Sequence, residues 1–492
     1  RDPDNYGRRG LSEVAAVPEE RPSVLLAVLT FTTALTSYVE AMVIPSLPHI
    51  QSALSASNEE MAWVVSAYLV VGASIAPLFG KMGDVYGKKK LYLVSLAFYS
   101  VAVLAAGLSP NVISLIAARA VQGFGFAIFP LSIAIVTDSF PRRLVAVAQG
   151  VLSAMTAIGM TIGMIAGAYI EELFGWRMMF HIAFGLSLLA LALAIAFIGP
   201  HPPVAKERID YVTTTLLSAA VALILVYLTE APYRGWFSPA QMTILAASLA
   251  LFAAFGYYEV STRNPLISPS ILKIRNVLVA NLAGLLSGVA MFLLFLGVIY
   301  YAEEPPPYGM GLSVLSAALT LMPATLAMIV IGPLVGYVTA RLGPKYVLIY
   351  GSLVAALGFW LFTAYRSSPT QLVLDSLITG VGIVSIITPI VNMVAVSAPP
   401  ESSAVSLGFN TMVRFLGAAA GPVVAATIMT DYKAYAMTYS LQGLAFFAEP
   451  GPSAFDIIFY IGMAFSLASL VVAAFTKNYR FGKRGTTVIL GS

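Results

Sequence analysis

Charged side chains are rare within the apolar stretches of this sequence, and two of them are an acid that could exchange a proton and an arginine that could act on that acid. Glu40 follows the uncharged run SVLLAVLTFTTALTSYV at 23–39, and Arg119 stands within LIAARAVQGFG at 115–125. Burial favours the neutral form of a carboxyl group, whereas a nearby arginine favours its ionised form. The sequence therefore predicts a proton-coupling pair of Glu40 and Arg119. The alternative is a permanent buried ion pair that only fixes helix packing.

A third charge, Asp375, lies about five residues inside another apolar run, 370–395. An ionisable group at such a depth is costly and is often functional. We interpret Asp375 as a second proton or cation site. The alternative is an interfacial acid that reaches the lipid headgroups.

The residue patterns that enzymatic, nucleotide-binding or metal-binding sites require are missing from the sequence. The sequence has no cysteine, no phosphate-binding G-x-x-x-x-G-K-[ST] loop, and no H-E-x-x-H or G-x-S-x-G motif. Its histidines, His49, His181 and His201, are far apart and do not suggest a metal site. We expect no enzyme activity, no catalytic residue, no metal and no cofactor.

The elements that would position these charges are membrane helices. Hydrophobic residues make up 59% of the 492 residues and charged residues only 10%, whereas soluble chains carry about 25% charged residues. A helix of about 20 residues crosses the ~30 Å of bilayer hydrocarbon. Nearly uncharged stretches of this length recur fourteen times, at 23–44, 60–79, 91–108, 112–137, 144–170, 176–199, 211–229, 240–261, 277–301, 313–337, 346–364, 370–395, 404–430 and 454–476. The fold class is therefore an all-α, multi-pass membrane protein.

The distribution of lysine and arginine predicts the orientation. Of the 27 basic residues, 21 fall in the segments on the same side as the N-terminus, and four fall in the alternate segments. Cytoplasmic segments are enriched in Lys and Arg. We expect both termini in the cytoplasm and the protein in the cell membrane.

An internal repeat divides the chain. Residues 75–91, IAPLFGKMGDVYGKKKL, align with 331–347, IGPLVGYVTARLGPKYV, at an offset of 256 that also places Arg119 on Asp375. Transporters are commonly built from such repeats. We therefore predict a cytoplasmic tail (1–22), a six-helix half (23–200), a linker with two extra helices (201–276), a second six-helix half (277–476) and a cytoplasmic tail (477–492).

Several motifs resemble those of the major facilitator superfamily, and in particular its fourteen-span drug:proton antiporters. GKMGDVYGKKK resembles the loop signature after the second helix, with Val85 where a basic residue is usual. LIAARAVQGFG resembles the fourth-helix signature, and GMTIGMIAGA the antiporter signature of the fifth helix, with Met164 in place of a proline. RGWFSP at 234–239 resembles a loop of fourteen-span members. The resemblance covers nearly the whole chain and implies two six-helix halves that alternate access. The family's use of an acid late in helix 1 also favours Glu40.

The loop and the glycine stripe have physical roles of their own. We interpret Gly80, Asp84, Gly87, Lys88 and Lys89 as a conformational latch that stabilises one access state, with a plain turn flanked by lysines as the alternative. A flat helix-packing stripe, which permits close approach of another helix, is predicted at Gly159, Gly163 and Gly167.

The sequence thus favours a secondary transporter that exports amphiphilic or hydrophobic small molecules against protons. A flippase or exporter of a lipid-like or glycan-linked metabolite is one alternative, and a non-transporting membrane scaffold or receptor is another. We expect the small-molecule substrate, protons and membrane lipids as partners, no nucleic acid, and a monomer.

Overall fold

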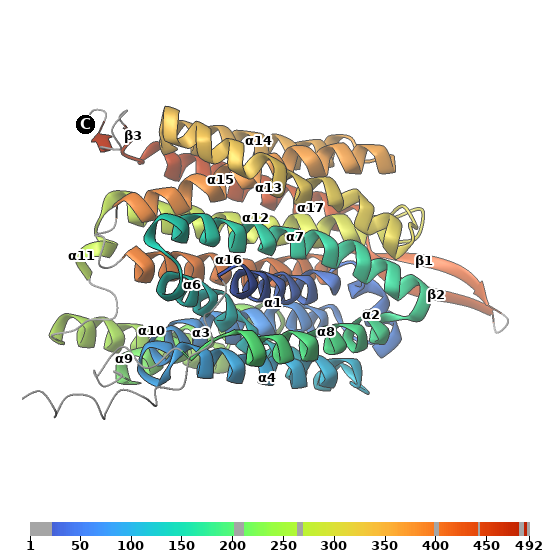
Figure 1. Ribbon diagram of the computed structural model, residues 1–492. Helices are drawn as coiled ribbons and strands as arrows, with labels where there is room; N and C mark the ends of the chain where they lie inside the picture. The colour runs from blue at the N-terminus through green and yellow to red at the C-terminus, as the bar shows by residue number, and fades with distance from the viewer. Residues whose placement is uncertain are drawn as a thin grey trace, which may run out of the picture.

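The computed structural model describes residues 22–200, 211–262, 269–397, 403–440, 443–481 and 487–489. Its helices form one bundle with nearly parallel axes (Figure 1). Thirteen helical segments of this described part are long and apolar enough to cross a membrane. They are α1 (Pro22–Met42), α4 (Lys88–Gly107), α5 with η1 and α6 (Val112–Ser139), α7 (Arg142–Phe174), α8 (Trp176–Phe197), α9 (Tyr211–Arg234), α10 (Pro239–Ser261), α12 (Arg275–Glu303), α13 (Val314–Leu342), α14 (Pro344–Ala364), α15 (Pro369–Ser397), α16 (Ser403–Asp431) and α17 (Pro452–Ala474).

The predicted span 60–79 coincides with α3 (Asn58–Tyr86), a helix of 29 residues. It begins at a capping box in which the Ser57 and Glu60 side chains each accept a backbone N–H. Because α3 lies outside the thirteen segments, the count of fourteen spans stays a prediction, as does the side of the membrane on which the termini lie. The all-helical bundle itself is confirmed.

The fourth predicted span, 112–137, is not one regular helix. It consists of α5 (Val112–Gln122), the 3₁₀ segment η1 (Gly123–Ala127) and α6 (Ile128–Ser139). The change in helix type falls at the sequence GFGFA, where η1 packs closely against α3 and α4. Short 3₁₀ segments within longer helices often mark functional positions.

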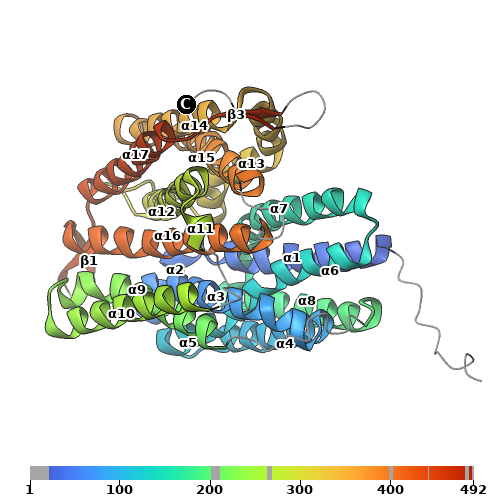
Figure 2. The ribbon, with the colours of Figure 1, turned by 90° about the vertical axis from the view of Figure 1, so that its left-hand side faces the viewer.

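The helices form two groups. We call α1–α8, with η1, the N-terminal group, and α12–α17 the C-terminal group. In both views α13, α14, α15 and α17 lie on one side and α3, α4 and α8 on the other, with α1, α7, α12 and α16 between them (Figures 1 and 2). The groups meet where α3 packs on α16 and α7 packs on α13.

The two helices between these groups form a hairpin. α9 and α10 pack on each other, and α9 also packs on α3 and α16. The Trp63 indole donates a hydrogen bond to Glu230 of α9 at 3.0 Å, which ties the hairpin to the N-terminal group.

Shorter elements were not predicted. α2 (Leu47–Leu54) and α11 (Pro269–Leu272) are short helices, and two antiparallel hairpins pair β1 (Lys433–Ser440) with β2 (Gly443–Pro450) and β3 (Tyr479–Phe481) with β4 (Thr487–Ile489). The β1–β2 hairpin projects beyond one end of the bundle (Figure 1). We call that end the outer end, because the charge bias predicts that it faces outside.

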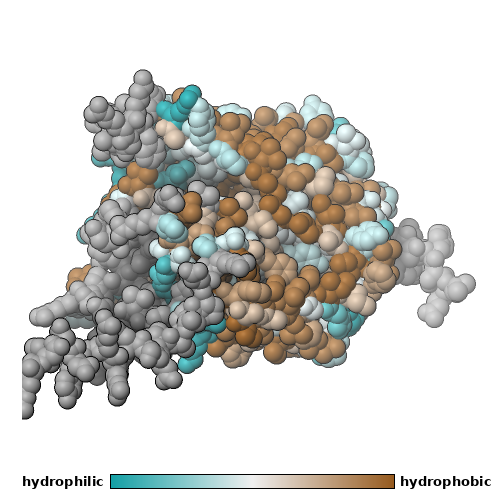
Figure 3. All heavy atoms as spheres, in the orientation of Figure 1, coloured by the Kyte–Doolittle hydropathy of each residue, from teal (hydrophilic) through white to brown (hydrophobic). Residues whose placement is uncertain are grey.

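The surface of the bundle suits lipid. Figure 3 shows apolar residues gathered across the middle of the visible face. Large apolar side chains there and elsewhere are open to the surroundings, such as Ile113 and Val330, each 71% exposed. Contiguous apolar surface on this scale is typical of membrane contact rather than of a soluble monomer.

Candidate functional site

Arg119 lies at the centre of the N-terminal group and is only 1% exposed. Its Nε donates to the Val64 carbonyl oxygen of α3 at 3.0 Å, and a terminal nitrogen donates to Gln122 Oε1 at 2.8 Å. Its guanidinium carbon lies 4.2 Å from the centroid of the Tyr68 ring, a cation–π contact. A buried charge requires such partners, and here they all belong to the N-terminal group.

Glu40 lies in the last turn of α1 and is half-buried. The chain continues through buried residues, including Ile44 and Leu47, so the acid stands well inside the bundle although its helix ends at Met42. Its carboxyl group lies beside Tyr68 and within electrostatic range of both Arg119 and Arg414. Glu40 and Arg119 do not form an ion pair within 4.0 Å, because the guanidinium is held by Val64 and Gln122.

Two tyrosine hydroxyls complete the surroundings of the acid. Tyr68 of α3 and Tyr99 of α4 are buried, both interact electrostatically with Glu40 and Arg119, and neither hydroxyl has a hydrogen-bond partner of normal geometry. No sequence pattern singles out these two tyrosines, because tyrosine is common in these spans.

The second arginine comes from the other group. Arg414 of α16 is half-buried, and its charge acts on Glu40. The sequence alone does not single out Arg414, whose guanidinium lies beside the Phe415 ring of the same helix. The depth of a residue along a helix can be read from sequence, but the helix face that meets a distant segment cannot.

Aromatic rings join the two groups beside these charges. Tyr68 stacks on Phe126 of η1 with centroids 5.4 Å apart, and Phe126 meets Phe415 of α16 edge to face at 4.5 Å. The Ser66 hydroxyl also donates to the Ala419 carbonyl oxygen at 2.9 Å. The charged site therefore borders the contact between α3 and α16.

The predicted glycine stripe lies against α1, next to Glu40. A Cβ added at Gly159 or Gly163 would overlap the carbonyl oxygen of Ala34 or Tyr38, and one at Gly167 would lie 2.6 Å from Met42 Cβ. α12 and α16 repeat the arrangement in the C-terminal group, where Gly288, Gly417 and Gly421 hold the two backbones together.

Asp375 is not part of this cluster. It lies in α15 and is 5% exposed, and its Oδ2 is buried with no hydrogen-bond partner. Its backbone carbonyl accepts a bond from Thr379 Oγ1 at 2.7 Å. The structure therefore brings Glu40 and Arg119 into one neighbourhood and leaves Asp375 apart.

The residues of the predicted latch lie at the end of α3, in the tight turn at Gly87 and at the start of α4. α3 continues to Tyr86, Gly87 adopts φ 95°, and α4 starts at Lys88. Lys88 Nζ pairs with Asp138 Oδ2 of α6 at 2.5 Å, and Lys89 Nζ donates to the Ile195 carbonyl oxygen at 3.2 Å. Asp84 and Gly80 fall within α3, but the side chain of Asp84 and the surroundings of Gly80 lie outside the described part of the chain.

Hydrogen bonds across the two groups close the outer end. Tyr300 Oη donates to Gln51 Oε1 at 3.1 Å, Asn58 Nδ2 donates to Thr430 Oγ1 at 3.2 Å, and Ser313 Oγ donates to Glu172 Oε2 at 3.3 Å.

A histidine lies at the same end. His49 Nδ1 lies 3.1 Å from Glu171 Oε1, and this hydrogen bond raises the pKa of His49.

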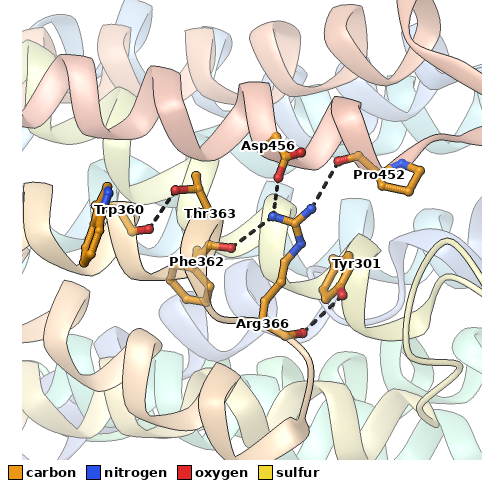
Figure 4. A network of polar contacts seen from close by, with 7 residues as sticks. All are labelled: Tyr301, Trp360, Phe362, Thr363, Arg366, Pro452 and Asp456. Carbon is orange, nitrogen blue, oxygen red and sulfur yellow. Dashed lines mark hydrogen bonds and ion pairs between the residues drawn. The ribbon is translucent and has the colours of Figure 1, made fainter.

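A separate polar network fixes the outer end of the C-terminal group. Arg366 pairs with Asp456 and donates to the carbonyl oxygens of Phe362 and Pro452 at 3.0 and 3.2 Å, while the Tyr301 hydroxyl donates to the Arg366 carbonyl oxygen (Figure 4). Apart from the buried Arg366 Nε, which has no hydrogen-bond partner, the polar groups named here are paired, which indicates a structural role.

Two further features bear on ligands. The described residues contain no group of three or more His, Asp or Glu side chains that could hold a metal ion. An apolar groove lies between α9 and α16, lined by residues such as Leu228, Trp236 and Val423. None of the charged residues above lines this groove, so it is distinct from the site around Glu40.

Comparison with known proteins shows the family. The family model of the Major Facilitator Superfamily matches residues 29–422. The chain is 25% identical to the multidrug resistance protein Stp of Mycobacterium tuberculosis (strain CDC 1551 / Oshkosh), over 84% of this chain and 77% of that protein. It is 27% identical to the cephamycin export protein CmcT of Amycolatopsis lactamdurans, over 85% and 88% of the two chains.

Solved structures agree on the fold. A bacterial homologue of the human lysosomal transporter Spinster matches with a TM-score of 0.66 at 14% identity, covering 92% of this chain and 96% of that one. The nucleoside transporter NupG matches with a TM-score of 0.63 at 15% identity, covering 92% and 100%. The chain is a multi-pass membrane transporter, and it belongs to the Major Facilitator Superfamily.

Proposed function

We propose that this transporter exports amphiphilic or hydrophobic small molecules in exchange for protons, and that Glu40 carries the proton. The observation that supports this most strongly is the placement of Glu40. It is a half-buried carboxyl group inside a membrane bundle, near two arginines and without a fixed ion-pair partner. The names of the relatives, which include a multidrug resistance protein and an antibiotic export protein, agree with a small-molecule cargo.

The chemistry follows from balanced opposing effects. Apolar surroundings favour the neutral acid, and the arginine charges favour the ionised acid. A modest change in either environment therefore changes whether Glu40 holds a proton. A permanent ion pair would resist such a change, but Arg119 is already bonded to Val64 and Gln122.

The two helix groups would supply the movement. We propose that they correspond to the halves 23–200 and 277–476 and that they rock about the central site. The closely packed glycine contacts of α7 on α1 and of α16 on α12 would keep the paired helices together during the movement. The turn at Gly87, with Asp84, would act as a latch at the inner end, and Asp375 would be a second proton or cation site.

Transport in proteoliposomes tests the proposal. Purified protein would be reconstituted with an imposed pH gradient and offered a panel of fluorescent amphiphilic dyes, lipids and sugars. We expect dye movement that follows the proton gradient and stops when a protonophore collapses it. Movement that ignores the gradient would contradict proton coupling, and movement of lipids or sugars alone would contradict the substrate class.

A further inference from the structure

We propose that Arg414 of α16, and not Arg119, makes the proton affinity of Glu40 depend on the conformation of the transporter. This inference rests on the proposed function, because it assumes that Glu40 carries a proton. It assigns Arg414 a positioning role, in which the residue acts through Glu40 without contacting the substrate.

The interaction of Arg119 with Glu40 does not depend on how one helix group moves relative to the other. Its partners are Val64 of α3 and Gln122 of its own helix, and its guanidinium lies over the Tyr68 ring. α3 and α5 pack on each other within the N-terminal group, to which α1 also belongs. When that group rotates as one body, Glu40 and Arg119 move together, and their interaction hardly changes.

Arg414 is held by the other group. Its backbone carbonyl lies against Gly288 of α12 so closely that a Cβ there would overlap it. Glu40 is carried by α1, which is held to α7 at Gly159, Gly163 and Gly167. The separation of Glu40 and Arg414 is thus set by the position of one helix group relative to the other.

The guanidinium of Arg414 is also not fixed in place by hydrogen bonds, so its position can change with the conformation. Among the described residues, its guanidinium makes no hydrogen bond, and its carbon lies 5.2 Å from the centroid of the neighbouring Phe415 ring. In the part of the chain that the structure describes, the titratable and charged groups that interact with Glu40 are Tyr68, Tyr99, Arg119 and Arg414, and Tyr38 interacts with Tyr99. Of these, only Arg414 lies in the C-terminal group.

The expected change in the proton affinity of Glu40 is large enough to couple proton binding to the conformation. Two unit charges in an effective dielectric of about 20 lose half of their interaction when a separation of about 7 Å doubles. That loss corresponds to roughly a 5–10-fold change in proton affinity.

The direction of the change in proton affinity is the one that proton-driven export requires. In this structure the outer end is closed by the bonds from Tyr300 to Gln51 and from Asn58 to Thr430. Arg414 lies beside the Phe415 ring, which packs through Phe126 onto Tyr68, the neighbour of Glu40. The positive charge then favours release of the proton while the outer side is shut. Opening the outer end would move α16 away from α1, and Glu40 would take up a proton from outside.

Distance measurements between two labels test this inference. The chain has no cysteine, so labels attach only to introduced ones, at Leu108→Cys in the N-terminal group and Thr370→Cys in the C-terminal group. Both positions are exposed at the outer end. We expect the distance distribution of the otherwise unchanged protein to shift between pH 5 and pH 9. Arg414→Gln should abolish this shift, or move its midpoint by about one pH unit, and Arg414→Lys should preserve it.

The outcomes separate the two proposals. If Glu40→Gln removes the pH response but Arg414→Gln leaves it unchanged, the role of Arg414 is contradicted and that of Glu40 stands. If Glu40→Gln leaves both the pH response and gradient-driven transport intact, the proposed function itself fails. Should Arg414→Gln not fold, Arg414→Met keeps a long side chain without the charge and must give the same loss of response.

Discussion

Glu40 and Asp375 are both acids inside the bundle, yet their surroundings differ. Glu40 is half-buried and lies near two arginines and two tyrosines, whereas Asp375 is 5% exposed and has a carboxylate oxygen without a hydrogen-bond partner. The internal repeat aligns Asp375 with Arg119, so the two halves place opposite charges at related positions. The comparison shows that two acids buried inside apolar helices can have different electrostatic surroundings. Because nearby charges shift the balance between the neutral and the ionised acid, we expect the protonation of Glu40 to respond to a change of conformation more than that of Asp375.

The largest effect is expected at Glu40. Glu40→Gln should reduce gradient-driven transport at least tenfold, because the amide cannot exchange a proton, while substrate binding and folding are retained. Proteoliposome transport and substrate binding to purified protein would measure this. Glu40→Asp, which keeps the carboxyl group, is the matched control and should retain part of the transport.

Asp375 should behave differently. Asp375→Asn should lower transport by less than about fivefold and should raise stability by about 1 kcal/mol, since it removes a buried charge that lacks a partner. Thermal unfolding in detergent would detect the gain. A loss of transport as severe as that of Glu40→Gln would remove the distinction between the two acids.

The comparison also shows what sequence could predict. Glu40, Arg119 and Asp375 stood out because charges are rare in apolar runs, and the bundle followed from length and composition. Arg414 did not stand out, because its relation to Glu40 depends on the tertiary packing of α16 on α3 across the interface. The 3₁₀ break at Gly123–Ala127 and the β1–β2 hairpin depend on packing, so the periodicity of the sequence did not reveal them. Asp138, the partner of Lys88, was not singled out, since it lies at the end of a span where charges are common.

A smaller effect is expected from the glycine contacts that hold α1 in place. Gly163→Ala should destabilise the protein by about 1–3 kcal/mol, because the added Cβ overlaps the Tyr38 carbonyl oxygen two residues before Glu40. Gly185→Ala in α8 is the control, since no atom lies within 4 Å of a Cβ there. Gly417→Ala, between α16 and α12, would show whether the second group depends equally on its contact. Equal stability of Gly163→Ala and Gly185→Ala would contradict the packing role.

The smallest effect concerns the pH dependence of the outer end. The hydrogen bond to Glu171 raises the pKa of His49 above its usual value of about 6.5. The pair therefore stabilises the folded protein fully below about pH 6.5, and this contribution is lost as the pH rises through the raised pKa. His49→Ala should flatten the dependence of thermal stability on pH in this range. An unchanged slope would show that the pair is too exposed to matter.

Proton release on substrate binding tests the central claim most directly. Purified protein in weakly buffered detergent would receive a dye that the transport assay has identified, and the pH change would be recorded with an indicator. We predict that the wild-type protein releases protons on binding and that Glu40→Gln binds the dye without release. Equal proton release from the Glu40→Gln variant would contradict the assignment of the coupling proton to Glu40.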